Sequence, residues 1–214
     1  MLSTTERTRL NRAKHKTRTE RADLFDVLDH GLLCHMAVVV DGTPLALPTC
    51  HARIGDTLYL HGSTGARSLR QGSEVCVTVT VPDGLVLARS AVHHSFNHRS
   101  AMVLGTPRVV EDEDERLDAL RAIVDHLVPG RWDQVREPST QDLAKTRVLA
   151  LPLEEASVKV RTGGPNDEPE DAELPVWAGE LPLTLTVGEP RPDPGRQVEV
   201  PLPGHVARMV GRAW

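Results

Sequence analysis

The stretch that decides the fold is "LLCHMAVVVDGTPLALPTCHARIGDTLYLHGS", residues 32 to 63. Its alternating apolar and β-branched residues predict three strands, over 32–40, 44–53 and 57–62. Asp41-Gly42 is a strong hairpin signal, and Gly55-Asp56 makes a second turn. Consecutive strands joined by tight turns indicate an antiparallel sheet.

The β pattern returns further along the chain. It predicts strands over 74–81, 85–91, 100–111 and 146–163, with a turn at Pro82-Asp83-Gly84 between the first two.

Helical spacing of apolar residues appears in three places. We expect helices over about 19–30, from about 113 to Pro129-Gly130, and over 139–145. Thr17 and Glu20 have capping-box spacing before the first helix, and Gly31 suits its C-terminal stop. Six or seven strands in hairpin order, with helices before and among them, predict an α+β protein, mainly β, built as a small antiparallel barrel.

The composition excludes several classes of protein. A formal charge of -5 and an aromatic content of 3% argue against a nucleic-acid partner. Three cysteines without regular spacing do not form a disulfide framework, so we expect a reducing, cytoplasmic setting. No run of apolar residues is long enough to span a membrane.

The two ends of the chain differ from its centre. The first 21 residues are rich in arginine and lysine, and we expect a solvated tail or a strap that packs on a partner subunit. Segments 164–173 and 190–214 are rich in proline and charge, which predicts irregular structure.

The end of the third strand has the parts of an anion site. Within "LYLHGSTGARSL", His61, Gly62, Ser63, Arg67 and Ser68 would offer backbone N–H groups, hydroxyls and a guanidinium within one turn. The same residues also suit an ordinary loop, and the spacing is not that of a P-loop. From the turn alone both interpretations remain open.

Histidines gather in "ARSAVHHSFNHRSAMVLG", residues 88 to 105. His94 and His98 have i, i+4 spacing, but no glutamate lies between them to act as a base. We therefore predict a polar loop and not a metal site. Cys34-His35 and Cys50-His51 also fail as a zinc site, because neighbouring side chains on a strand point to opposite faces.

In their order, these segments closely resemble the pyridoxamine 5′-phosphate oxidase-like flavin-nucleotide-binding proteins, and within them the branch with the nitroimidazole-resistance flavoproteins. The resemblance covers roughly residues 5 to 190. It implies an FMN-binding split β-barrel with flanking helices, which forms a homodimer with the cofactor at the interface. The domains would be a basic arm over 1–18, the barrel over 19–163, a family-like extension over 164–190 and an irregular tail over 191–214.

The resemblance also implies roles for individual residues. The turn after the third strand would hold the flavin phosphate, and the strand before it would flank the flavin ring. The implied cofactor-binding residues are Pro48, Thr49, Cys50, His51, His61, Gly62, Ser63, Arg67, Ser68, Asn97, Arg99, Ser100 and, in the neighbouring subunit's cleft, Trp132.

Two departures limit the activity that the resemblance implies. His98 stands where the family has an aromatic residue, and the C-terminal Arg/His substrate motif of true pyridoxamine 5′-phosphate oxidases is missing. We therefore expect an FMN-dependent oxidoreductase acting on a small organic molecule, with NAD(P)H as a candidate electron donor and His51 or His94 as candidate proton donors. The alternatives are a non-catalytic flavin or haem binder and a reductase that uses the deazaflavin F420.

Overall fold

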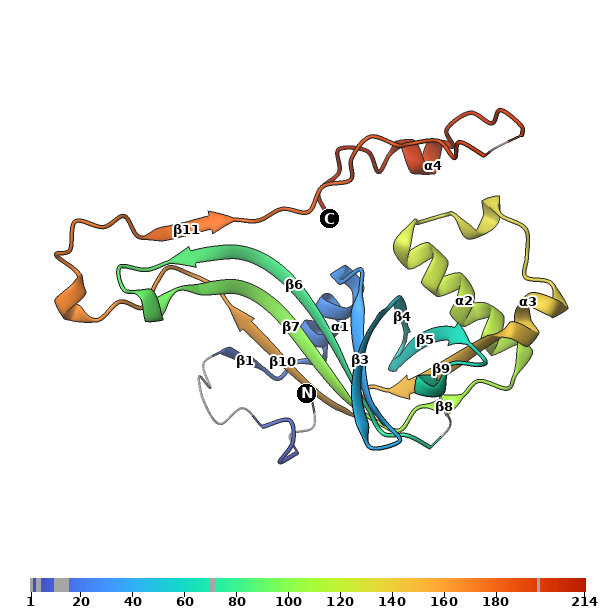
Figure 1. The fold of residues 1–214 in the computed structure, drawn as a ribbon, viewed down its shortest axis with the longest axis horizontal. Coiled ribbons are helices and arrows are strands. Elements are labelled where there is room, and N and C mark those ends of the chain that lie inside the picture. Colours follow the sequence, from blue (N-terminus) through green and yellow to red (C-terminus); the bar gives the residue numbers. More distant parts are fainter. Residues whose placement is uncertain (1, 3–4, 10–15, 70–71, 196) are drawn as a thin grey trace.

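The computed structural model describes residues 2, 5–9, 16–69, 72–195 and 197–214. Two antiparallel sheets form the framework of the fold (Figure 1). The larger sheet has the order β1-β10-β7-β6-β2-β3, with β11 also paired to β6, and the smaller has the order β4-β5-β9-β8. The strands of the larger sheet are β1 (Thr17–Arg18), β2 (Cys34–Val40), β3 (Thr43–Thr49), β6 (Val75–Leu87), β7 (Ser95–Gly105), β10 (Glu155–Arg161) and β11 (Gly179–Pro182). Those of the smaller sheet are β4 (His51–Ile54), β5 (Thr57–Ser63), β8 (Arg108–Val109) and β9 (Thr146–Pro152).

The first three helices of the described residues occupy the positions that the apolar spacing predicts. They are α1 (Arg21–His30), α2 (Glu113–Leu127) and α3 (Thr140–Lys145), and a single turn, α4 (Gly204–Ala207), lies in the tail. Leu24, Val27 and Leu28 of α1 are buried in one core with residues from both sheets. Ala119 and Ile123 of α2 pack in a second core with side chains of the smaller sheet. The expected α+β barrel with helices is confirmed.

Helix capping follows the sequence in part. Asp112 accepts a hydrogen bond from the Glu115 N–H, and Ser139 forms a capping box with Asp142. The capping box predicted from Thr17 and Glu20 is wrong, because Glu20 itself is the N-cap and Thr17 lies in β1.

Two of the predicted single strands are each divided between the sheets. The strand expected over 44–53 breaks at Cys50, where the chain passes from β3 in the larger sheet to β4 in the smaller. The strand expected over 146–163 breaks after Pro152, and the Leu153 N–H donates to the oxygen of Asp56. A break of one or two residues lets one β-rich run serve both sheets.

The turn predicted at Pro82-Asp83-Gly84 is wrong. Strand β6 runs through these residues and pairs with β7 on both sides of a register shift between Pro82 and Gly84. A proline has no N–H for the ladder, so an irregular point in the pairing accommodates it. The strand expected over 100–111 also differs, since β7 starts at Ser95 and a gap separates it from β8.

The C-terminal segment returns to the barrel. In Figure 1, β6, β7 and β11 extend together away from the end of the molecule that carries α2 and α3. After β11 the chain passes through α4, and an isolated bridge pairs Thr186 with Ala213. The predicted irregular tail thus includes a helical turn and an anchored end. Within the described residues, no helix is both long and apolar enough to cross a membrane.

Candidate functional site

The predicted phosphate turn lies at the end of β5 and leads into a single 3-10 turn over Arg67–Leu69. A Cβ on Gly62 would lie 2.6 Å from Cδ1 of Leu69, which is buried in the core. The absence of a side chain at Gly62 therefore leaves room for Leu69 to pack against β5. Ser63 and Arg67 are exposed, so both face solvent on this turn.

Several groups of this turn already have partners inside the protein. The Thr64 N–H donates to the Lys145 oxygen, the Ala66 N–H to the Ser63 oxygen and the Gly65 N–H to Ser63 Oγ at 3.2 Å. The backbone nest expected from the sequence is thus largely satisfied internally. An anion here would depend on the Arg67 guanidinium and nearby hydroxyls, and Arg67 Nη1 lies 2.9 Å from an Asp41 carboxylate oxygen.

The segment from Pro48 to His51 spans the change of sheet. Pro48 is exposed, and Thr49 and Cys50 are half-buried. Thr49 Oγ1 lies 3.5 Å from the His61 oxygen, which connects this segment to the phosphate turn. These residues are therefore close to the turn, as the resemblance implies.

The His51 side chain, in contrast to that of Pro48, points into the protein interior. This side chain is fully buried, and its Nε2–H donates to the Leu28 oxygen at 3.0 Å. Its ring centroid lies 5.1 Å from that of His126 on α2. Burial lowers the pKa of His51 to about 4, so the imidazole is neutral near pH 7. The structure thus encloses this candidate proton donor against α1 and α2.

The predicted site residues on β7 make different contacts. Asn97 is buried, donates to Glu180 Oε2 at 2.5 Å and accepts from the Arg161 guanidinium. Arg99 makes ion pairs with Asp83 and with Asp26 of α1, which raise its pKa. Asn97 and Arg99 thus join separate segments of the chain.

The remaining predicted residues lie apart from the turn in this single chain. Ser100 Oγ donates to the Lys159 oxygen at 3.5 Å. His94 is exposed and lines a cavity of about 320 Å³ with Phe96 and Leu181. Trp132 follows α2, and its backbone N–H donates to the Asp125 carboxylate.

A larger cavity lies at a gap in the edge of the larger sheet. Strand β2 pairs with β6 up to Val79, and β11 pairs with β6 from Gly84 onward. Residues 80–83 line the cavity between these two pairings. Its volume is about 530 Å³, within the range of small-molecule sites. The lining residues are His30, Gly31, Leu32, Leu33, His35, Thr80, Val81, Pro82, Asp83, Arg99, Leu183, Thr184, Leu185 and Trp214.

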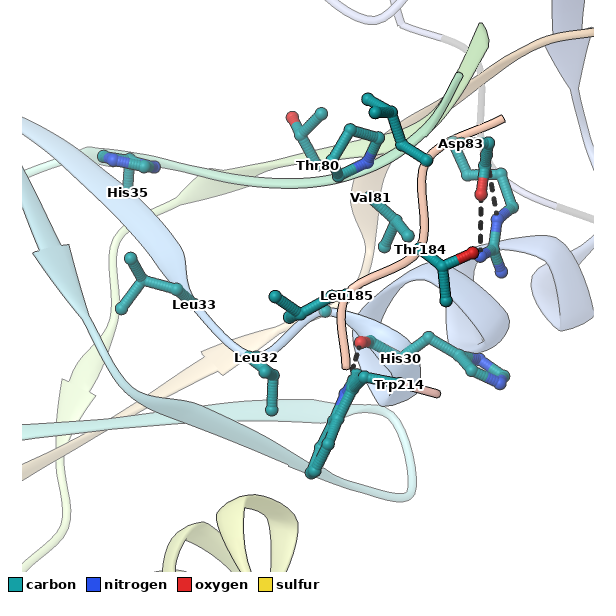
Figure 2. A pocket seen from close by; sticks show the side chains of 14 residues that line it. His30, Leu32, Leu33, His35, Thr80, Val81, Asp83, Thr184, Leu185 and Trp214 are labelled. Carbon is teal, nitrogen blue, oxygen red and sulfur yellow. Dashed lines mark hydrogen bonds and ion pairs between the residues drawn. The ribbon is translucent and has the colours of Figure 1, made fainter. Parts of the chain in front are cut away.

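Apolar side chains dominate two sides of this cavity. Figure 2 shows Leu33 and His35 on one side and Thr184 and Leu185 of the C-terminal segment on the other. The Trp214 indole N–H donates to the His30 oxygen at 3.0 Å. A neighbouring cavity of about 550 Å³ shares His30 and Trp214, so the chain's last residue lies between the two.

The cavity wall built by the C-terminal segment was not predicted from the sequence. Leu181, Leu183 and Leu185 alternate with other residues, which is a strand-like signal that precedes the tail predicted as irregular. No local pattern placed Trp214, because its partner His30 is distant in sequence.

A split antiparallel barrel with an exposed cationic turn and an apolar cavity defines a class of small-molecule-binding split-barrel proteins. The chain belongs to the pyridoxamine 5′-phosphate oxidase family, whose model matches residues 20–160. The family resemblance found in the sequence is confirmed. No curated protein matches the chain.

Two solved structures resemble nearly the whole chain. The flavocytochrome Anf3 from Azotobacter vinelandii is 37% identical, with a TM-score of 0.90 over 96% of this chain and 97% of that one. The FAD and haem binding protein from Mycobacterium smegmatis is 40% identical, with a TM-score of 0.85 over 92% and 98%. A candidate 5-nitroimidazole antibiotic resistance protein from Bacteroides thetaiotaomicron shares the fold, at 22% identity and a TM-score of 0.57 over 67% and 86%.

Proposed function

We propose that this chain is a flavin-binding redox protein that also carries haem. The observation that carries the proposal is its similarity, at 37% and 40% identity and over nearly its full length, to a flavocytochrome and to an FAD and haem binding protein. Both similarities include the C-terminal segment, which the family model does not reach. When bound, a flavin supplies hydride and single-electron transfer, and a haem supplies single-electron transfer.

The residues of the β5 turn suit the flavin phosphate. Arg67 is 64% exposed and offers a guanidinium fork, and Ser63 presents a hydroxyl beside it. Thr49, whose hydroxyl lies near the His61 oxygen, would lie along the flavin ring. The resemblance implied FMN, whereas the M. smegmatis relative binds FAD, so the phosphate site is common to both candidates.

We further propose that the working unit is a homodimer. Val39 is 61% exposed and Leu47 is also exposed, on neighbouring strands β2 and β3. These residues lie beside an apolar depression of about 250 Å³ lined in part by Ala37, Pro44 and Leu104. A second copy packed on this face would bury these side chains and bring its own Trp132 toward the flavin.

The structure assigns no acid or base to the reaction. His51 is enclosed, so His94 is the better placed of the two candidate proton donors. We propose an NAD(P)H-driven oxidoreductase that acts on a small molecule, in which the chain's residues bind and orient the cofactors. F420 remains an alternative cofactor, which the extraction experiment below would identify.

The test is cofactor extraction followed by anaerobic reduction. Protein purified without added cofactor would be denatured, and the released chromophores separated and compared with FMN, FAD, F420 and haem standards. We expect a flavin and haem, and bleaching of the flavin by NADH or NADPH. A protein that binds none of these flavins after incubation with each would contradict the proposal.

A further inference from the structure

The cavity at the edge of the larger sheet has apolar walls that the described residues leave exposed. Leu183 and Leu185 of the C-terminal segment are exposed, the latter to 62%, and so is Leu33 on the opposite side. Exposed leucines that face each other across a gap are suited to a flat apolar ligand. The cavity volume of about 530 Å³ gives room for a macrocycle of haem size.

One imidazole at this cavity is available to a metal ion. His35 is exposed, lines the cavity and has no hydrogen-bond or ion-pair partner within the described part of the chain. Figure 2 shows it across the cavity from Leu185. A neutral imidazole is a common axial ligand of haem iron.

The other histidine of the lining is less available. His30 Nδ1 lies 2.8 Å from the Asp26 oxygen and 3.1 Å from its carboxylate. Figure 2 shows the His30 ring on the far side of Trp214 and Thr184, away from His35. His30 therefore contributes its backbone oxygen, which holds Trp214 in place.

The C-terminal wall of the cavity is built by residues that the family model does not match. The family model ends at residue 160, whereas Leu183, Leu185 and Trp214 come from beyond it. The flavocytochrome and the FAD and haem binding protein are two relatives whose similarity covers most of this segment. The added segment thus builds a cavity wall that the barrel lacks.

The cavity and the Arg67 guanidinium lie toward opposite ends of β2. Arg67 of the turn pairs with Asp41, just beyond the end of β2, whereas His35 is near its start. Asp41 lies six residue steps of extended chain beyond His35, a distance of about 20 Å. A phosphate held by Arg67 near Asp41 would therefore leave His35 free, whereas a flavin ring along Thr49 would lie close to it, because Thr49 pairs with Cys34 in the β2–β3 ladder.

We infer that this cavity is the haem site, with His35 as an axial ligand and with Leu183, Leu185 and Trp214 as the wall that covers the macrocycle. This inference rests on the proposed function and gives its second cofactor a location. Haem bound here would lie near the start of β2, in the same chain as the phosphate turn that follows β5.

The test titrates haem into the flavin-loaded full-length protein. His35→Ala should weaken haem binding about 10- to 100-fold and change the position of the Soret band, and added imidazole should restore the band. Leu185→Glu should also weaken haem binding, because it places a charge in the apolar wall. Flavin content should stay unchanged in both variants.

Two matched variants provide the controls. His93→Ala removes a histidine outside the cavity, and Leu202→Glu adds the same charge at another exposed leucine of the tail. Both should bind haem like the parent protein. If His35→Ala and Leu185→Glu keep the parent's haem affinity and Soret band, haem binds elsewhere and the inference is wrong.

Measuring flavin binding in the same experiment distinguishes failure of this inference from failure of the proposed function. Loss of flavin rather than haem in His35→Ala would assign the cavity to the flavin ring and overturn the inference alone. A parent protein that takes up no flavin would contradict the proposed function, even if haem titrates normally.

Discussion

Trp214, the last residue of the chain, donates its indole N–H to the backbone oxygen of His30 at the end of α1. Its own backbone N–H donates to the Leu185 oxygen at 2.8 Å. These two hydrogen bonds hold the C-terminal segment beside the barrel, where Leu185 and Trp214 line the cavity.

Trp214→Ala should release this segment. Loss of the indole hydrogen bond and its packing should cost about 1 to 3 kcal/mol of local stability. We expect faster amide hydrogen exchange in residues 183–187 and 204–214, with little change in β6 and β7. Equal exchange in the variant and the parent would show that Trp214 does not hold the segment.

Arg67→Ala should weaken flavin binding. Loss of a charge-assisted contact to phosphate should cost about 1.5 to 3 kcal/mol, or about 10- to 100-fold in affinity. Flavin titration followed by fluorescence quenching measures this. Arg136→Ala is the matched control, because Arg136 is also an exposed, ion-paired arginine but lies outside the turn.

Asp41→Asn should have the opposite effect. Asp41 competes with phosphate for Arg67, and an exposed ion pair contributes about 0 to 1 kcal/mol. Asparagine tolerates the positive φ of 49° at this position, so the hairpin should keep its shape. We expect flavin affinity to rise by up to about fivefold, and a fall would argue that Asp41 helps to position the cofactor.

The turn after β5 was predicted from the sequence only in part. Glycine, serine and arginine in "HGSTGARS" predicted a place for an anion, and Ser63 and Arg67 are indeed exposed on one turn. The sequence could not show that the Thr64 N–H bonds to the Lys145 oxygen, because Lys145 lies far along the chain.

The positions of the strands were easier to predict than the sheet in which each strand pairs. The β-rich runs around Cys50 and Pro152 are clear in the sequence, but each divides between two sheets. Burial of His51 was equally hidden, since its acceptor is the Leu28 oxygen on a helix. Such tertiary contacts decide which residues reach the site, and local patterns do not encode them.

His51 should make the fold sensitive to acid. Its pKa is lowered to about 4 in the folded protein, whereas in an unfolded chain a histidine has its ordinary pKa of about 6.5. The unfolded state therefore binds more protons between these values, so stability falls as pH drops from 6.5 to 4, by about 3 kcal/mol.

Urea denaturation of the parent and of His51→Asn over this pH range measures the contribution. The variant should start less stable at pH 7 but lose less stability on acidification. The pH dependence that remains in the variant's free energy of unfolding should come from groups such as His61 and His98, whose pKa values burial also lowers. Parallel pH profiles of the two proteins would show that His51 does not titrate as its burial requires.

Asn97→Ala should destabilise the junction of β7 with the C-terminal segment. The change removes the acceptor of Arg161 and the donor to Glu180, at a cost of about 1.5 to 3 kcal/mol. Thermal unfolding measures the loss, and Ser157→Ala on β10 is a control with little expected effect. A variant as stable as the parent would show that Arg161 finds other acceptors.

The absorbance spectrum of the protein, purified and then incubated with flavin and haem, tests the central claim most directly. We predict flavin bands and a Soret band that stay with the protein through gel filtration. A protein that emerges colourless, with both cofactors in the small-molecule fractions, would contradict the account.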